Sequence, residues 1–370
     1  MLGEQRAESD GAVARRAFDG LDGLRGIAAL SVGVLHVDGL ILHRGFNAMT
    51  FLAVDFFFCL SGFVLSHAYG ARLAAGTLQP GAFFVLRVCR LYPMILAGAV
   101  LAVAIGLTMR EGPAHETVAM GLGTLLLLPA GFAFGEIAFP LNNVFWSLLF
   151  ELGAGAVFGC LAASRDRIWA LIAATSAVIL LLVAAKGVGP GLLGFGNPVL
   201  FLFGVPRVLL PFALGVLIER RFAANAPGQA TAPLLPALLL VLVLFCIPGQ
   251  QKFAALASTL VAVPLIVWLG AGAARTRSPR LSAAARHLGA VSYPFYAVHL
   301  PLVLLAGDFA ADADLGDTAR WALAALTLAA AWVLSIWIER WWDRPARALL
   351  ARRLAARQAL AAAAQAASSP

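Results

Sequence analysis

The amino-acid sequence predicts an all-α integral membrane protein, a polytopic bundle of about ten transmembrane helices. Hydrophobic residues make up 61% of the 370 residues, charged residues make up 12%, and the mean hydropathy is +0.87. The apolar residues gather into runs of about 20, the length that an α-helix needs to cross the hydrocarbon core of a bilayer. A soluble globular protein is closer to half apolar, so that class is excluded.

Ten apolar runs are long enough to span, and each is expected to form one helix. They lie at 24–43, 50–70, 84–108, 142–163, 168–186, 199–219, 233–249, 253–271, 288–306 and 320–339. An eleventh run, 118–133, is shorter and rich in glycine, so it fits either a crossing or a short re-entrant segment. If it does not cross and the N-terminus is cytoplasmic, 21 of the 27 Lys and Arg residues face the cytoplasm, against 10 if it does cross. Basic residues concentrate on the cytoplasmic side of membrane proteins, so we expect no crossing there and both termini inside.

The chain is expected to hold one folded unit, a transmembrane domain at 21–347. A cytoplasmic segment, 1–20, precedes it and an Ala-rich cytoplasmic tail, 348–370, follows it. The first segment has no apolar core, so no cleavable signal peptide is expected. The net charge is +8, but the basic residues form short clusters between apolar runs, which indicates membrane topology and no nucleic-acid partner. The four cysteines stand singly, so neither a metal site nor a disulfide framework is expected.

Arg25 and His36 lie in the first predicted span, near one face of the helix. Eleven residues separate them, so they lie within ~20° of each other around the helix and ~16 Å apart along its axis. A snorkelling arginine and a packed histidine would explain the pair without a function, yet ionisable residues inside a span usually serve one. Arg87 and Arg90 open the third span at the same membrane surface, three residues apart and therefore on one face.

Guanidinium groups bind phosphate in two-point contacts, so Arg25, Arg87 and Arg90 are candidates for an anion site. The alternative is that they only obey the charge rule for membrane topology. We assign Arg72 and the arginines of 275–286 to topology alone.

Other polar side chains lie within predicted spans, where they must face the interior of the bundle. A buried carboxylate needs a partner, so Glu151 or Asp55 is expected to bind one imidazole nitrogen of His36 and make the other nitrogen a general base. For His299 a packed core histidine and a direct role are both open. The full set is Asp55 and Ser61 in the second span, Asn143, Trp146, Ser147 and Glu151 in the fourth, and Tyr293, Tyr296 and His299 in the ninth.

Together these stretches resemble the acyltransferase 3 family, the membrane-bound O-acyltransferases of bacterial surface glycans. The chain departs from the family pattern at Leu149, where a second serine is usual. The resemblance covers residues 20–347 and rests on five motifs in order: the Arg25 to His36 spacing, Asp55 to Phe63, Arg87 with Arg90 and Pro93, Trp146 with Ser147 and Glu151, and Ser292 to His299.

The resemblance implies transfer of an acyl group, usually acetyl from acetyl-CoA, to a hydroxyl of a cell-envelope glycan or lipid-linked saccharide. It implies acyl-CoA as donor substrate, no bound cofactor, and a multi-pass location in the bacterial inner (cytoplasmic) membrane. His36, Arg25 and Glu151 are the implied catalytic residues, and Arg25, Arg87 and Arg90 the implied CoA-binding residues. A succinyl or longer donor and a small lipophilic acceptor such as a macrolide fit the same family.

The residues alone leave a rival from another class. A transporter or flippase for a lipid-linked sugar could use the buried Asp, Glu and His side chains as a proton relay. A scaffold without enzymatic activity is disfavoured, because it has no need of several ionisable residues in its core.

Overall fold

The computed structural model describes residues 18–45, 49–109, 112–224, 234–247, 251–272, 278–354 and 356. Every regular element in these ranges is helical, which confirms the predicted all-α class. The expected N-terminal segment, 1–20, and the expected tail, 348–370, lie largely outside the described residues.

The helices fall into three groups. The long ones are α2 (Asp19–Val37), α3 (Leu52–Ala74), α4 (Pro80–Met109), α6 (Phe145–Leu161), α7 (Asp166–Ala185), α9 (Gly204–Ala224), α13 (Pro279–Asp312) and α14 (Asp317–Ile338). The short ones are α5 (Ala114–Leu125), η2 (Ala130–Phe134), η3 (Pro190–Leu192), α8 (Pro198–Leu202), α10 (Leu234–Phe245), α11 (Lys252–Ala257) and α12 (Val263–Gly272). Three π-helical turns continue long helices: η1 (Asp38–Leu42) after α2, η4 (Ser258–Ala262) between α11 and α12, and η5 (Glu339–Asp343) after α14.

Eight helices in the described part of the chain are long and apolar enough to cross a membrane. Two further predicted spans correspond to the shorter apolar helices Phe145–Leu161 and Leu235–Phe245. The glycine-rich run at 118–133 holds the end of α5 and the turn η2. The 12 residues of α5 extend ~18 Å, less than the ~30 Å of the hydrocarbon core, so α5 alone does not reach across. The protein is a multi-pass membrane protein.

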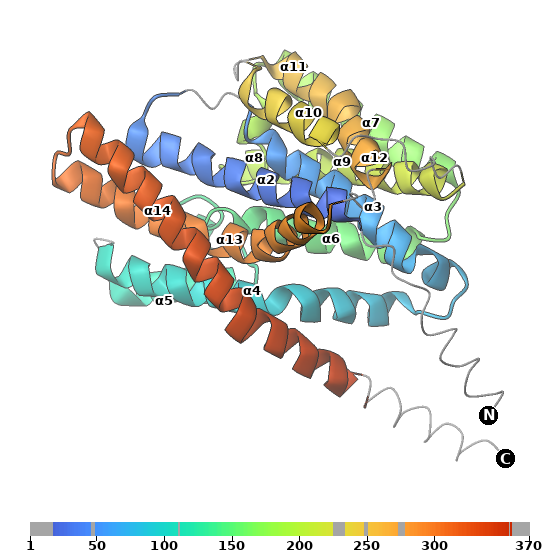
Figure 1. Ribbon diagram of the computed structural model, residues 1–370, viewed down its shortest axis with the longest axis horizontal. Helices are drawn as coiled ribbons and strands as arrows, with labels where there is room; N and C mark the ends of the chain where they lie inside the picture. Colours follow the sequence, from blue (N-terminus) through green and yellow to red (C-terminus); the bar gives the residue numbers. More distant parts are fainter. Residues whose placement is uncertain are drawn as a thin grey trace.

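α2 packs against both α3 and α13, and α3 in turn packs against α9 while α13 packs against α4 and α14 (Figure 1). The start of α2 and the end of α14 lie toward the same end of the bundle (Figure 1). Because the first spanning helix begins and the last one ends on the same side, the chain crosses the membrane an even number of times.

Two glycines allow α3 and α9 to approach each other closely. A Cβ atom on Gly62 would lie 2.1 Å from the carbonyl oxygen of Phe212, and one on Gly215 would lie 2.0 Å from the carbonyl oxygen of Cys59. Both contacts are with backbone, which a small shift of a side chain cannot relieve. Close packing at small residues is the main attraction between helices in a membrane, where lipid is as apolar as the side chains.

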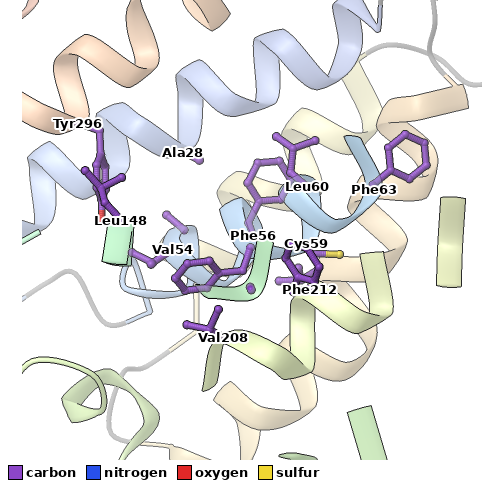
Figure 2. Close-up of a cluster of buried hydrophobic side chains, with 14 of the residues drawn as sticks. Ala28, Val54, Phe56, Cys59, Leu60, Phe63, Leu148, Val208, Phe212 and Tyr296 are labelled. Carbon is purple, nitrogen blue, oxygen red and sulfur yellow. The ribbon is translucent and has the colours of Figure 1, made fainter. Parts of the chain in front are cut away.

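An apolar cluster holds α3 in place beside the site. Figure 2 shows Phe56, Cys59 and Phe63 of α3 packed with Val208 and Phe212 of α9, and all five side chains are fully buried or nearly so. Of the other labelled residues, Val54 and Leu60 also belong to α3, and the rest come from α2, α6 and α13 (Figure 2). The cluster therefore fixes the helix that supplies Ser61 to the site described next.

Candidate active site

A cavity of about 430 Å³ lies between α2, α3, α4, α6, α13 and the end of α14. The structure brings together on its wall eight side chains that the sequence singled out, from five different helices. These are Arg25, Ser61, Arg87, Arg90, Ser147, Glu151, Tyr293 and Tyr296.

Arg25 is fixed by contacts with α13 at the more exposed end of the cavity, here called the mouth, where the Arg286 and Arg344 side chains also lie. Its Nε donates to Ser292 Oγ at 3.1 Å, and its Nη2 donates to the carbonyl oxygen of Gly289 at 3.0 Å and to Asp22 Oδ1 at 2.7 Å. The absence of a side chain at Gly289 makes these contacts possible, because a Cβ atom there would lie 2.7 Å from the Cβ of Asp22.

Glu151 pairs with Arg87 and not with a histidine. Arg87 Nη2 donates to Glu151 Oε1 at 2.6 Å, and Ser61 Oγ donates to the same oxygen at 3.1 Å. The Arg87 side chain is 7% exposed and the Glu151 side chain 22%. The expected contact between Glu151 and His36 is therefore wrong. The carboxylate instead neutralises an arginine that would otherwise stand buried and unpaired.

The mouth carries an excess of positive charge. Among the described residues, Arg90 has no carboxylate within the 4.0 Å of an ion pair, and its charged neighbours include Arg25, Arg87 and Arg347. Six arginines and four carboxylates line the cavity, a net charge of +2 that suits an anionic ligand. They are Arg25, Arg87, Arg90, Arg286, Arg344 and Arg347, with Asp22, Glu151, Glu339 and Asp343.

Ser147 and Tyr296 form the deep end of the cavity. Their hydroxyl oxygens are 2.7 Å apart, and Ser147 Oγ also donates to the carbonyl oxygen of Val144 at 2.8 Å. The one hydroxyl proton of Ser147 is thereby used, so Tyr296 donates to Ser147. The ring of Phe57 meets the Tyr296 ring edge-on at 5.8 Å between centroids.

His36 and His299 form a hydrogen-bonded pair beyond this end. His36 Nδ1 lies 3.1 Å from His299 Nε2 and 2.9 Å from the carbonyl oxygen of Val32. His299 Nδ1 lies 2.9 Å from the carbonyl oxygen of Phe295 and 3.0 Å from that of Tyr296. Carbonyl oxygens only accept, so the proton of neutral His299 is on Nδ1 and its Nε2 accepts from His36 Nδ1–H. The Nε2 lone pair of His36 is then available as a base.

The histidine pair lies one helical turn past the cavity. His299 follows Tyr296 by three residues on α13, and their ring centroids are 6.0 Å apart. His299 is fully buried, whereas His36 is partly exposed. Because His36 contacts a fully buried residue of α13, its ring points into the contact between α2 and α13.

Besides the histidine pair, three of the predicted residues lie outside the cavity wall, namely Asp55, Asn143 and Trp146. Asp55 pairs with Arg207 at 3.2 Å, both side chains 2% exposed, so the expected bond from Asp55 to His36 is also wrong. The Arg207 guanidinium lies over the Trp146 ring, 5.0 Å from its centroid. Asn143 does not line the cavity, and its neighbour Asn142 donates to the carbonyl oxygen of Ala297 at 2.8 Å. These contacts join α3, α6, α9 and α13 and support the site from outside.

Sequence reasoning missed part of the mouth. Arg286 was expected to serve topology alone, and Arg344 and Arg347 were not singled out, yet all three line the cavity. For Arg344 and Arg347 the available signal was their spacing from Glu339 and Asp343, by five and four residues. Among the described residues no group of three His, Cys, Asp or Glu could hold a metal ion.

The comparisons with known proteins identify the family of the chain. The family model described as an acyltransferase domain, that of acyltransferase 3, matches residues 18–340. A protein of Rhizobium radiobacter named "Protein 2 in picA locus" is 39% identical over 183 residues, which cover 45% of this chain and 94% of that protein. No solved structure matches the chain. The chain therefore belongs to the acyltransferase 3 family and is a multi-pass membrane O-acyltransferase.

Proposed function

We propose that the protein transfers an acetyl group from acetyl-CoA to a hydroxyl of a cell-envelope glycan or lipid-linked saccharide, in the cytoplasmic membrane of a bacterium. The observation that carries the proposal is one cavity with an arginine-rich mouth and a deep end one helical turn from a histidine with a free ring nitrogen.

The mouth suits the phosphates of CoA. Arg25, Arg87 and Arg90 come from two helices and all line the cavity, and among the described residues no carboxylate lies within 4.0 Å of the Arg90 guanidinium. Fork-shaped guanidinium groups bind phosphate oxygens in pairs. The pantetheine arm then lies along the apolar side chains of α3 toward Ser147 and Tyr296.

His36 supplies the chemistry. Its Nε2 takes the proton of the acceptor hydroxyl while the hydroxyl oxygen attacks the thioester carbonyl. The C–S bond breaks, and the CoA thiolate leaves with the proton from His36, so acetyl-CoA and a hydroxyl give an ester and free CoA. Tyr296 is the part of the cavity wall that adjoins the histidine pair, because its ring centroid lies 6.0 Å from that of His299.

The orientation follows from the same charges. The arginine mouth faces the cytoplasm, where acyl-CoA is made, and the histidine pair lies deeper in the membrane, within reach of an acceptor from the outer side. The rival transport function loses its basis, since His36 and His299 contact neither Asp55 nor Glu151 and form no relay with them.

The test uses His36→Ala with His287→Ala as the matched control. His287 is exposed on α13, the same helix as His299. Acetyl-CoA-dependent acetylation of envelope glycan from a deletion strain is measured by mass spectrometry. We expect His36→Ala to lose about 10²- to 10⁴-fold in rate and the control to retain the wild-type rate. Wild-type activity of His36→Ala would remove this residue from the mechanism.

A further inference from the structure

The end of α14 closes one side of the mouth. Trp342 Nε1 donates to the carbonyl oxygen of Pro93 at 2.7 Å, which anchors η5 on α4. The helix continues after η5 to residue 354, and Asp343, Arg344 and Arg347 line the cavity. The last described helix thus places Arg344 and Arg347 on the wall of the cavity that Arg87 and Arg90 of α4 also line.

The π turn explains how these residues face the cavity. η5 adds residues to one turn of the helix, which rotates the residues that follow around the helix axis. Glu339 and Asp343 are buried, while Trp341 is 62% exposed on another face. Such turns often occur at functional sites.

Arg90 and Arg347 have hydrogen-bond donors left over. Arg347 Nη2 pairs with Asp343 Oδ2 at 2.7 Å, but its Nε is buried without a partner among the described residues. Among the described residues, no carboxylate lies within 4.0 Å of the Arg90 guanidinium, and Arg347 is one of its charged neighbours. Asp343 interacts with both guanidinium groups, so one negative charge stands beside two positive charges, and one positive charge is left for an anionic ligand.

We infer that Arg90 and Arg347 form a second anion subsite, which takes the 3′-phosphate of the CoA donor. The inference rests on the proposed function. The reacting thioester is at one end of acyl-CoA and the 3′-phosphate is on the ribose at the other. With the thioester at Ser147 and Tyr296, the ribose lies at the mouth, where Arg347 comes from the inner end of α14 and Arg90 is exposed. Arg25 and Arg87, nearer to Ser292 and Ser61, face the diphosphate.

The experiment compares acetyl-CoA with 3′-dephospho-acetyl-CoA on wild type, on Arg347→Gln and on the control Arg352→Gln. Arg352 is exposed on the same helix and does not line the cavity. In wild type and control, removal of the 3′-phosphate should raise KM about ten-fold or more, with kcat unchanged, because charge-assisted hydrogen bonds are lost. In Arg347→Gln the two donors should have the same raised KM.

Other outcomes are informative in different ways. The deciding quantity is the ratio of the KM values for the two donors. If this ratio in Arg347→Gln equals the wild-type ratio, whether or not both KM values are raised, the subsite is overturned. If wild type uses neither donor, the proposed function fails and the subsite with it. Because Arg347→Gln leaves Asp343 buried without its partner, the double variant Asp343→Asn/Arg347→Gln is measured as well. It should show the same loss of discrimination, and retained discrimination in a folded double variant would contradict the inference.

Discussion

A histidine acts as a general base through a ring nitrogen that carries no proton and has an open lone pair. His36 has such a nitrogen because its Nδ1–H donates to the carbonyl oxygen of Val32 and to His299 Nε2, whose own proton is fixed on Nδ1 by two carbonyl groups of α13. The orienting groups are a backbone carbonyl and a neutral imidazole. In the interior of a membrane protein this avoids the high desolvation cost of an unpaired carboxylate.

This arrangement predicts different results for two substitutions of His299. In His299→Ala, His36 Nδ1–H loses its acceptor on α13, and kcat should fall about 10- to 100-fold, the equivalent of ~1.5–3 kcal/mol, with little change in the KM for acetyl-CoA. In His299→Gln, the amide oxygen can accept from His36, so kcat should recover in part.

Steady-state kinetics on the glycan acetylation reaction measure both variants. Equal kcat values for His299→Ala and His299→Gln would show that His299 only fills space. A raised KM without loss of kcat would place it in donor binding.

The ionisable residues of the site could be found in the sequence, but their partners could not. Asp55 was expected to reach His36 and instead pairs with Arg207, 152 residues away in the sequence. Which side chain a buried carboxylate meets depends on how α3 packs on α9, and helical periodicity carries no information on that. The eight residues that do share one cavity, from Arg25 to Tyr296, were identifiable because charged and polar groups within apolar spans are rare.

At the scale of helices, the close contact of α3 with α9 places Ser61 in the cavity. Gly62 faces the backbone of Phe212, so a larger residue there must push two helices apart. Spans and their approximate ends were predictable from hydropathy. The π turns were not, because one extra residue in a turn leaves no mark in an apolar sequence, and η5 decides which residues after α14 face the mouth.

Gly62→Ala should therefore destabilise the protein by ~1–3 kcal/mol, the usual cost of overpacking. The matched control is Gly153→Ala on α6, where a Cβ atom meets nothing within 4 Å. Thermal unfolding in detergent should show a clear drop in Tm for Gly62→Ala and almost none for the control. Equal Tm values for the two variants would contradict the close helix contact.

At the scale of the whole molecule, the charge distribution indicates which end of the cavity faces the cytoplasm. Arg72 is exposed at the end of α3, on the expected cytoplasmic side, and Asp314 is exposed between α13 and α14, on the opposite side. Near that second end Arg44 pairs with Asp317. The number of crossings could be estimated from the sequence only within a few, because α6 and α10 are shorter than a typical span.

The orientation can be measured with single cysteines at these two positions, in a chain whose four native cysteines are replaced. In spheroplasts, which lack the outer membrane but keep the cytoplasmic membrane intact, a membrane-impermeant maleimide should label Asp314→Cys. Arg72→Cys should be labelled only after the cells are opened. The reverse pattern would place the arginine mouth outside and remove the route for a cytoplasmic donor.

The central claim is that acyl-CoA occupies the cavity with its phosphates among the arginines and its thioester toward the histidine pair. A cryo-EM map of the protein with a non-hydrolysable acetyl-CoA analogue tests it most directly. The account predicts phosphate density beside Arg25, Arg87 and Arg90 and the acyl end next to Tyr296 and His36. Well-defined analogue density outside this cavity, or with its acyl end at the arginines, would contradict it.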